Sequence, residues 1–388
     1  MNYFKAICVI TGIILFSSCS KQKTSESVFS TEALAYCEAA TLANRYVVKW
    51  EDGTYSIETT SSGETDEDFR KNFVDKNLDF ISHVDRDYQI TLQQNSSNNT
   101  SQSNVVSWGP YNIKADALWS SGYYGQNVLV GVVDSMVDNS HIQLSHNVIS
   151  VEKFNAEAND PTRNRHGTHV AGIIAANPQY GPVEGVAPSA KLVTGQFIGN
   201  SGGGSLGDAI LAMNAVAAKG AKVINMSWGG APCVQNLKSA IGDLSDKGIL
   251  IVTAAGNDGL NLDVSPNYPA AFMFKNQMNV AASTIDNFLI SFSNRGYKTV
   301  NIAAPGVNII STVPNNGYES MDGTSMAAPM VSGAAALLWS AFPQATSIQI
   351  KQSLFSTVDV DYDLQVSTRG RINVLRAFQA LKNILSAQ

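Results

Sequence analysis

Cysteine and histidine are scarce in this chain, and no stretch of it is strongly basic. The 388 residues include 4 cysteines and 5 histidines, and 26 Lys or Arg stand against 32 Asp or Glu. A net charge of −6 without basic–aromatic clusters argues against a nucleic-acid partner. Cys8 and Cys19 lie in or next to an expected signal segment, and the two that remain, Cys37 and Cys233, do not make a disulfide framework, so their state stays open. The hydrophobic fraction of 44% is typical of a globular protein with a large core.

The amino-terminal residues show the pattern of an export signal. Lys5 precedes an apolar run at residues 6–16, which is too short to span a bilayer comfortably. Ser-Ser-Cys follows, and small residues before a cysteine resemble the bacterial lipobox, whose cysteine is lipidated. We therefore expect a signal peptide over residues 1–18 and lipidation of Cys19, which would anchor an envelope lipoprotein to the outer membrane or cell surface. Phe16 stands where Leu is usual, so ordinary cleavage and secretion remain the alternative.

Composition divides the rest of the chain into four segments. Residues 19–43 include a polar stretch without periodicity, so we expect a tether. Residues 44–94 carry strand-like runs around one helix-like run, which predicts a small α+β domain. Residues 95–104 are uncharged and of low complexity, so we expect a flexible linker that is easily cut. Residues 105–388 form the last and largest segment.

The largest segment alternates apolar runs with helix-like runs. This alternation predicts an α/β fold, with a mostly parallel central sheet and helices on both of its faces. The expected strands cover residues 191–197, 222–226, 249–254 and 278–281, and the expected helices cover residues 206–219 and 237–247.

One serine has the setting of a nucleophile. In Gly-Thr-Ser-Met-Ala-Ala-Pro, residues 323–329, Ser325 stands between a glycine-led turn and an Ala-rich helical run. The start of a helix offers unpaired N–H groups and a positive dipole end, both suited to a developing oxyanion. Serine is a weak nucleophile by itself, so it requires a base and a group that orients the base.

Candidates for both partners lie upstream. Asp134 follows an apolar run at residues 128–133, which is typical of a buried strand. Catalytic groups of open α/β sheets gather at the carboxyl ends of such strands. His166 begins an expected helix, and Asn257 follows another apolar run at residues 249–252. The sequence therefore offers a carboxylate, an imidazole, an amide and a hydroxyl at strand or helix ends.

Each of these residues also has an ordinary structural interpretation. Ser325 alone is most often a helix N-cap, and Asp134 alone is most often a turn residue. His166 and His169 lie three residues apart, as a metal-binding pair does, but no HExxH pattern or nearby cysteine supports zinc. The combination of four such residues in one order favours catalysis.

That order and spacing resemble the subtilisin-like serine proteases, over roughly residues 105–381. The resemblance implies that Ser325 is the nucleophile, His166 the general base and Asp134 the residue that orients the base. It also implies that Asn257 supplies the oxyanion-hole amide. The expected reaction is hydrolysis of peptide bonds through an acyl-enzyme.

The resemblance extends to inhibition and to substrate binding. Residues 44–94 are similar to the family's inhibitory prodomain, which packs on the protease and feeds its tail into the active site. A peptide would pair between two chain edges, and glycines in the pocket walls leave room for a large apolar side chain. The implied substrate-binding residues are Ser201, Gly202, Gly203, Ser227, Trp228, Gly229, Ala254, Ala255 and Gly256.

Two departures from the family pattern bear on activity and metal binding. Met136 stands where glycine is usual, and a positive φ there would strain the turn that holds Asp134. At the family's principal calcium site, the loop at residues 177–183 contains two prolines, and Gln143 replaces an aspartate ligand. Loss of a carboxylate weakens a site for a hard cation. We therefore expect no required cofactor and no metal there, although structural calcium elsewhere stays possible.

Together these features predict an exported serine endopeptidase, made as a self-processing zymogen, that acts on proteins or peptides. Its partners would be those substrates, its own prodomain, and the membrane through a lipid anchor. Two alternatives remain open. The same site could perform peptide ligation or cyclisation, or the chain could be a non-catalytic surface lipoprotein that retains the fold for binding.

Overall fold

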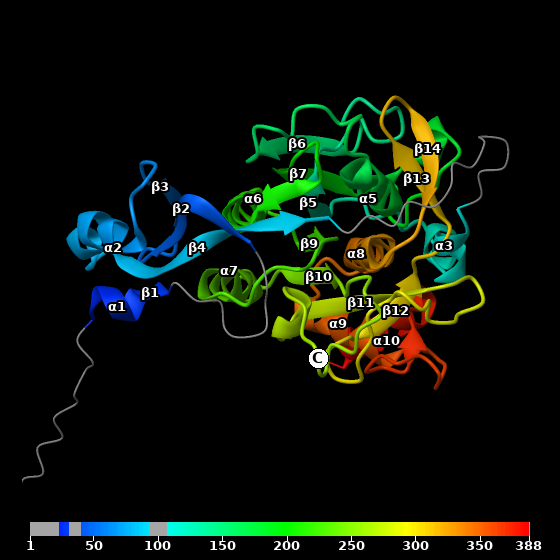
Figure 1. The fold of residues 1–388 in the computed structure, drawn as a ribbon. Coiled ribbons are helices and arrows are strands. Elements are labelled where there is room, and N and C mark those ends of the chain that lie inside the picture. Colours follow the sequence, from blue (N-terminus) through cyan, green and yellow to red (C-terminus); the bar gives the residue numbers. More distant parts are fainter. Residues whose placement is uncertain (1–22, 31–39, 93–106, 388) are drawn as a thin grey trace, which may run out of the picture.

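The computed structural model describes residues 23–30, 40–92 and 107–387, which form a small strand-rich unit beside a larger α/β body (Figure 1). The expected signal peptide, Cys19, Cys37 and the linker at residues 95–104 lie outside these ranges. No helix within the described ranges combines the length and apolarity needed to cross a membrane.

A mostly parallel sheet runs through the body. Its centre is β5 (Leu129–Ser135), which pairs in parallel with β7 (Lys191–Ile198) and β9 (Val223–Met226). Beyond β9 the order continues through β10 (Leu250–Ala254), β11 (Gln277–Ser283) and β12 (Ile302–Pro305). The edges hold β6 (Val148–Lys153), β15 (Asp359–Val360) and β16 (Gly370–Arg371). The apolar runs at residues 191–197, 222–226, 249–254 and 278–281 thus lie in strands, as the sequence predicts.

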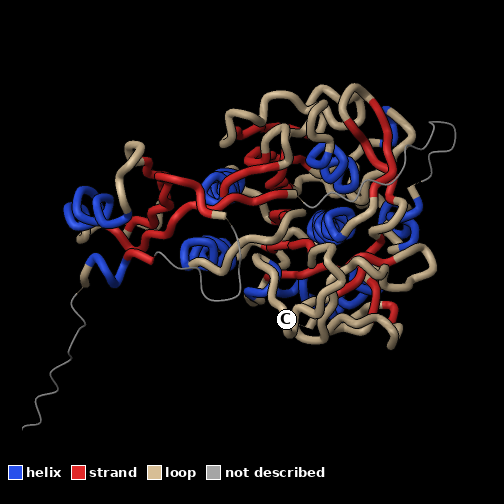
Figure 2. The backbone as a smooth tube through the Cα atoms, in the orientation of Figure 1, coloured by secondary structure: helices blue, strands red, loops and turns tan. Residues whose placement is uncertain are grey.

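Helices cover both faces of this sheet, with strands between them (Figure 2). Successive side chains of a strand point to opposite faces. Val132 accordingly packs in the same core as α5 (His166–Ala175) and α8 (Thr324–Ala341). Val133 packs in a second core with α6 (Leu206–Ala218) and α7 (Gln235–Asp246). Burial on both faces explains why the strand sequences are apolar throughout.

The other elements of the body lie around this layered core. They are the helices α3 (Trp108–Asn112), α4 (Asp116–Trp119), α9 (Ser347–Ser356) and α10 (Val374–Ser386), and the hairpin of β13 (Ile309–Val313) and β14 (Gly317–Met321). The hairpin contacts α5 and was not anticipated from the sequence.

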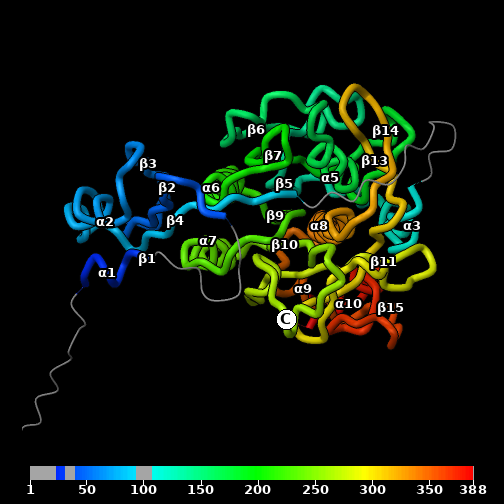
Figure 3. The backbone as a smooth tube through the Cα atoms, viewed as in Figure 1, coloured from blue at the N-terminus to red at the C-terminus, as the bar shows by residue number. Residues whose placement is uncertain are grey.

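The small unit has its own core. Its antiparallel strands are β2 (Thr41–Trp50), β3 (Tyr55–Thr59) and β4 (Ile81–Thr91), and its helical segment comprises α2 (Asp66–Phe69), a π-helical turn at Arg70–Val74 and a 3₁₀ turn at Asp75–Asn77. Tyr46 stacks on Phe69 with ring centroids 3.8 Å apart. Following the chain in Figure 3, β4 leads from this unit directly to the body.

Part of the expected tether is ordered instead. Ser25–Val28 forms the short helix α1, which Thr24 caps, and Phe29–Ser30 forms β1, which pairs in parallel with β4. Val28 is buried in the core of the small unit. The polar composition of this stretch concealed a capping box and two apolar residues, which together are enough to dock it.

Candidate active site

Asp134 lies on β5, at the carboxyl end of a central strand, and is fully buried. Its Oδ1 accepts a hydrogen bond from the backbone N–H of Ser135 and lies 2.8 Å from Nδ1 of His166. A buried carboxylate beside Nδ1 fixes the imidazole tautomer that carries its proton on that nitrogen. The other imidazole nitrogen, Nε2, is then the one able to accept a proton.

His166 begins α5, and the residue after it explains how the helix comes so close to β5. The N–H of Gly167 donates to Oγ of Ser135 at 2.8 Å, and a Cβ on Gly167 would lie 2.4 Å from the carbonyl oxygen of Ser135. Only glycine fits at that distance. The second residue of the His-Gly motif thus permits the contact between helix and strand that brings His166 to Asp134.

Ser325 is the second residue of α8, immediately after a sharp turn. Gly323 has φ +152°, a conformation that side-chain-bearing residues rarely adopt. The hydroxyl of Ser325 donates to the carbonyl oxygen of Ser227 at 2.8 Å, and the hydroxyl of Ser227 donates to the carbonyl oxygen of Ser325 at 2.9 Å. The nucleophile candidate is thus held at the helix start, beside the end of β9.

Asn257 is oriented by Thr324, for which the sequence pattern indicated no role. Thr324 donates to Oδ1 of Asn257 from both its backbone N–H and its hydroxyl, each at 2.9 Å. The Thr324 hydroxyl also accepts from the N–H of Gly256 at 3.0 Å. Because the amide oxygen is occupied, the NH₂ group of Asn257 is left to donate elsewhere.

A cavity adjoins these residues. Of the nine predicted substrate-binding residues, five line it: Ser227, Trp228, Gly229, Ala254 and Gly256. The cavity is also lined by Ser325, Asn257, Thr324, Asn267 and Leu92. Thr324, Asn267 and Leu92 were not predicted. The indole of Trp228 donates to the carbonyl oxygen of Val133 at 3.0 Å.

The other four predicted substrate-binding residues do not line the cavity. Three of them, residues 201–203, lie at or beside an edge strand, and the fourth is Ala255. Gly203 lies on β8 (Gly203–Ser205), which pairs in antiparallel fashion with β4, and the carbonyl oxygen of Gly202 accepts from Leu92 N–H at 2.9 Å. Ser201 is exposed beside this edge. Ala255 packs in a separate core cluster, so its side chain faces away from the cavity.

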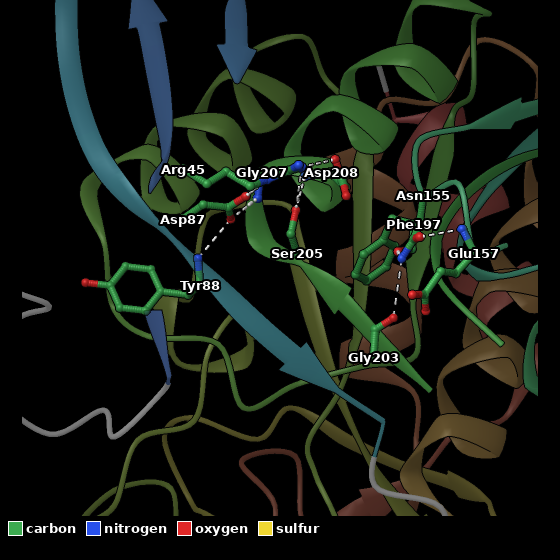
Figure 4. Close-up of polar contacts among 10 residues, drawn as sticks. All are labelled: Arg45, Asp87, Tyr88, Asn155, Glu157, Phe197, Gly203, Ser205, Gly207 and Asp208. Atoms are coloured by element: carbon green, nitrogen blue, oxygen red, sulfur yellow. Dashed lines mark hydrogen bonds and ion pairs between the residues drawn. The ribbon is translucent and has the colours of Figure 1, made fainter. Parts of the chain in front are cut away.

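Polar contacts across the junction between the small unit and the body surround this edge (Figure 4). Arg45 on β2 pairs with Asp87 on β4 at 2.6 Å and with Asp208 on α6 at 2.5 Å. Asp87 also accepts from the N–H of Gly207, near the start of α6, where the helix dipole favours an anion. Burial raises the pKa of Asp208, and its ion pair with Arg45 opposes that shift.

A second helix start receives a carboxylate from the same strand. Asp85 on β4 accepts from the N–H of Asn236 at 2.7 Å, and the Asn236 side chain donates to the carbonyl oxygen of Val47 at 2.7 Å. On the body side, Asn155 donates to the carbonyl oxygen of Phe197 at 3.0 Å, which supports the segment before β8 (Figure 4). The small unit is thus bonded to α6, α7 and the substrate edge.

His169 has a structural position. It is fully buried, its Nε2 donates to the carbonyl oxygen of Glu319 at 3.0 Å, and burial lowers its pKa to about 3. Its Nε2 is therefore committed to the backbone of β14. Within the described ranges, no group of three or more His, Cys, Asp or Glu side chains is placed to hold a metal ion.

The two departures from the family pattern differ in their outcome. Met136 is not among the described residues with positive φ, so the strain considered beside Asp134 is absent.

The loop at residues 177–183 is the second departure. Gln143 is buried, and its Nε2 donates to the carbonyl oxygens of Asn177 and Val183 at 2.8 and 2.7 Å. A calcium ion needs such oxygens free and a carboxylate nearby. The residues around this loop do not fit a calcium ion.

The sequence is similar to those of known proteins of one family. The model of the subtilase family matches residues 125–378. Subtilisin DY of Bacillus licheniformis is 36% identical over 280 residues, which cover 71% of this chain and 99% of that protein. Subtilisin E of Bacillus subtilis (strain 168) is 39% identical over 277 residues, 71% of each chain. Subtilisin-like protease 2 of Plasmodium falciparum (isolate 3D7) is 41% identical over 242 residues, which cover 58% of this chain but 18% of that protein.

Proposed function

The chain belongs to the subtilase family and is a serine endopeptidase, and we propose that Asp134, His166 and Ser325 are its catalytic triad. The observation that carries the assignment is the buried 2.8 Å contact between Asp134 and His166, with Ser325 at a helix start that Asn257 adjoins. Asn257 and Ser325 both line the cavity that the predicted substrate-binding glycines form.

In this proposal His166 removes the proton from the Ser325 hydroxyl as its oxygen attacks the carbonyl carbon of the substrate. The hydroxyl first turns away from the carbonyl oxygen of Ser227, to which it donates in this structure. Asp134 keeps the imidazole oriented and stabilises the imidazolium that forms. His166 then protonates the leaving amine, and water hydrolyses the acyl-enzyme by the same steps in reverse.

The developing oxyanion would be held by two donors. One is the side-chain NH₂ of Asn257, whose orientation follows from the two bonds that Thr324 donates to its oxygen. The other is the backbone N–H of Ser325, which lies in the first turn of α8 and has no partner within the helix. Donors fixed before the reaction stabilise the charge without reorganisation.

We further propose that residues 44–94 inhibit the enzyme until they are cut away. β4 pairs with β8 at the substrate edge, and Leu92 lines the cavity together with Ser325. A substrate strand that pairs at the same edge cannot enter while β4 is there. Cleavage within or beside residues 93–104 would separate this segment from the body and leave a mature chain beginning near residue 105.

Export and anchoring complete the proposal. Residues 1–18 would be removed, Cys19 would be lipidated, and the protein would remain at the cell envelope or be secreted after processing. The support is the sequence pattern at residues 6–19. The subtilase assignment is independent of this part, so activity and anchoring can be tested separately.

Mass spectrometry of the amino terminus, with and without Ser325→Ala, tests these proposals together. We expect the active chain to begin near residue 105 and the Ser325→Ala chain to keep residues 19–104 in a protease-deficient host. A fluorophosphonate probe should label the active chain and not the variant. Cleavage of the Ser325→Ala chain expressed alone would show that self-processing is wrong. An unlabelled wild-type chain would show that the triad assignment is wrong.

A further inference from the structure

The cavity beside Ser325 contains a polar side chain that the sequence pattern did not reveal. Asn267 lines it together with Gly229 and Gly256, and its Oδ1 accepts from the N–H of Gly230 at 2.8 Å. Its backbone carbonyl accepts from the N–H of Ala271 at 2.8 Å. Both ends of the residue are thus fixed by the surrounding chain.

Asn267 fills the space that the wall glycines leave. A Cβ placed on Gly229 would lie 2.9 Å from Oδ1 of Asn267, and one placed on Gly256 would lie 3.2 Å from its Nδ2. A side chain at either glycine would therefore crowd the amide, so the amide takes up the space beside both walls. Two glycines alone would predict a deep slot, but the side chain between them closes part of it.

The amide is also a directed donor. Because Oδ1 of Asn267 is committed to Gly230, the NH₂ group is the part left to meet a substrate side chain. A donor in a partly buried pocket favours a ligand that supplies an acceptor, since an unmatched polar group loses its bond to water. Gln supplies such an acceptor, whereas Leu fits by size alone; the rings of Phe and Tyr need the space that Asn267 occupies.

We propose that Asn267 determines the specificity of the pocket for the residue before the scissile bond. It selects Leu and Gln, which are short enough to stop at the amide, over Phe and Tyr. This inference rests on the proposed function, because it takes the cavity beside Ser325 as that pocket. Discrimination by one or two carbon atoms in an apolar pocket is typically about 10–200-fold.

The test compares peptides that differ only in the residue before the scissile bond, which is Leu, Gln or Phe. We expect wild-type kcat/KM to be at least about tenfold higher for Leu and Gln than for Phe. Asn267→Gly should raise the Phe-to-Leu ratio by about tenfold or more. Asn267→Leu keeps the shape but removes the NH₂ donor, so it should lower the Gln-to-Leu ratio and leave the Phe-to-Leu ratio unchanged.

Controls separate this inference from folding and from the proposed function. Asn315→Gly, on an exposed turn where φ is already +64°, should leave every ratio unchanged. Gly230 is exposed, so water can replace its lost acceptor in Asn267→Gly; Asn267→Ser serves if the glycine variant does not fold. Titration of Ser325 with a fluorophosphonate counts the active sites of each variant.

The outcomes are distinct. A wild-type chain that is not labelled and cleaves none of the peptides contradicts the proposed function. A labelled wild-type chain that prefers Phe to Leu, or an Asn267→Gly variant with an unchanged Phe-to-Leu ratio, overturns the role of Asn267 and leaves the triad intact.

We also propose that the side chain of Gln143 takes the place of a bound cation in the loop at residues 177–183. Its NH₂ group donates to the carbonyl oxygens of Asn177 and Val183, and its Oε1 accepts from the N–H of Val183 at 3.2 Å. A Cβ on Gly181 would lie 2.6 Å from the Gln143 amide carbon, so the loop is closed tightly around it.

The two arrangements satisfy the same carbonyl groups by different means. A hard cation neutralises oxygen lone pairs and requires carboxylate charge nearby. An amide donates N–H bonds to the same oxygens and needs no charge. The neutral Gln143 therefore ties its own turn to this loop without a metal, and stability should not depend on calcium.

Thermal unfolding of the chain in the Ser325→Ala background tests this proposal, with calcium chloride or EDTA added. The chain with the natural Gln143 should have the same midpoint of thermal unfolding in calcium chloride and in EDTA. Gln143→Glu should lower the midpoint in EDTA, because a carboxylate then faces two carbonyl oxygens, and millimolar calcium should restore part of the loss. Gln179→Glu, on the exposed side of the same loop, should respond to neither.

Three results would overturn the proposal that Gln143 takes the place of a cation. One is a wild-type midpoint that falls in EDTA and recovers with calcium, together with loss of this response in Gln143→Met. Another is calcium binding to the wild-type loop by calorimetry that Gln143→Met removes. The third is an unchanged midpoint for Gln143→Met, which lacks the amide bonds, because that would show that these bonds do not hold the loop. If Gln143→Glu does not fold, Gln143→Met provides the comparison.

Discussion

The hydroxyl of Ser325 donates a hydrogen bond to the carbonyl oxygen of Ser227, and the hydroxyl of Ser227 returns one to the carbonyl oxygen of Ser325. This reciprocal pair joins the first turn of α8 to the end of β9. It holds the nucleophile candidate in a fixed place, with its proton donated to Ser227. In the proposed mechanism the hydroxyl must leave this acceptor and turn to His166.

If that rotation joins Ser325 to His166 and Asp134, the three residues act as one unit. Single substitutions Ser325→Ala and His166→Ala should each lower kcat by about 10⁶, which is the magnitude known for the corresponding residues of subtilisin itself. The double substitution should cost little more than either single one. Steady-state kinetics on a peptide substrate would measure these losses. Additive losses in the double variant would contradict the triad.

The oxyanion donors give a second prediction. Asn257→Ala should lower kcat by about 10²–10³ with little change in KM, a range known from the corresponding subtilisin asparagine. Thr324→Val removes one of the two bonds that orient the amide. It should produce a smaller loss in the same parameter, because Thr324 touches no reacting atom. A change in KM alone for either variant would show that Asn257 binds substrate instead of the transition state.

Met136 provides a prediction about stability. Because its φ is not positive, glycine at this position offers no relief of strain and increases the entropy of the unfolded chain. Met136→Gly in the Ser325→Ala background should therefore lower the free energy of unfolding, by about 0.5–1 kcal/mol. Denaturant titration would measure it. A gain in stability, or a higher kcat in the active chain carrying Met136→Gly, would restore the idea that methionine distorts the turn.

The sequence was sufficient to predict the placement of residues that lie in local patterns. Asp134, His166 and Asn257 each follow or begin an element whose periodicity is plain, and the carboxyl ends of parallel strands bring such residues to one edge. Ser325 sits in a short motif whose glycine turn and helix start are both visible. The parallel sheet followed from continuous apolar runs, because burial on both faces leaves no alternation.

Residues that act through distant partners could not be predicted in this way. Asn267 lies in an irregular loop, where asparagine is a common turn residue, and only the fold brings its amide between Gly229 and Gly256. Arg45 meets Asp208 across 163 positions of sequence. Thr324 lies in a recognised motif, but its bonds to Asn257 depend on how two loops meet.

The junction between the small unit and the body gives a fourth prediction. Asp87 is fully buried, pairs with Arg45 and accepts from Gly207 N–H. Asp87→Ala would leave Arg45 with fewer partners and the N–H of Gly207 without its acceptor, and removing one partner of a buried charged contact costs about 2–5 kcal/mol. After self-cleavage, the amino-terminal segment should therefore dissociate sooner and peptidase activity should appear earlier. Asp52→Ala, on an exposed turn, is the control, and equal time courses for both would contradict an inhibitory junction.

His169 is the basis of a prediction about pH. Burial lowers its folded-state pKa to about 3, whereas an exposed histidine titrates near 6.5. Below pH 6.5 the unfolded chain takes up a proton that the folded chain does not accept until about pH 3. The unfolded state is therefore favoured as the pH falls through this window, and the contribution of His169 to stability is fully present only above it.

Replacement by a side chain that does not titrate should remove this dependence. Between pH 6.5 and 3 the free energy of unfolding should fall by about 1.4 kcal/mol per pH unit through His169 alone. His169→Gln can still donate to the carbonyl oxygen of Glu319. It does not fill the buried space of the imidazole ring, however, so we expect it to be less stable than the wild type at pH 7.5. By pH 5 that difference should narrow by about 2 kcal/mol. Denaturant unfolding of both chains in the Ser325→Ala background measures it, with exposed His146→Gln as the control. Parallel pH profiles for His169→Gln and the wild type would show that His169 takes up its proton in the folded protein.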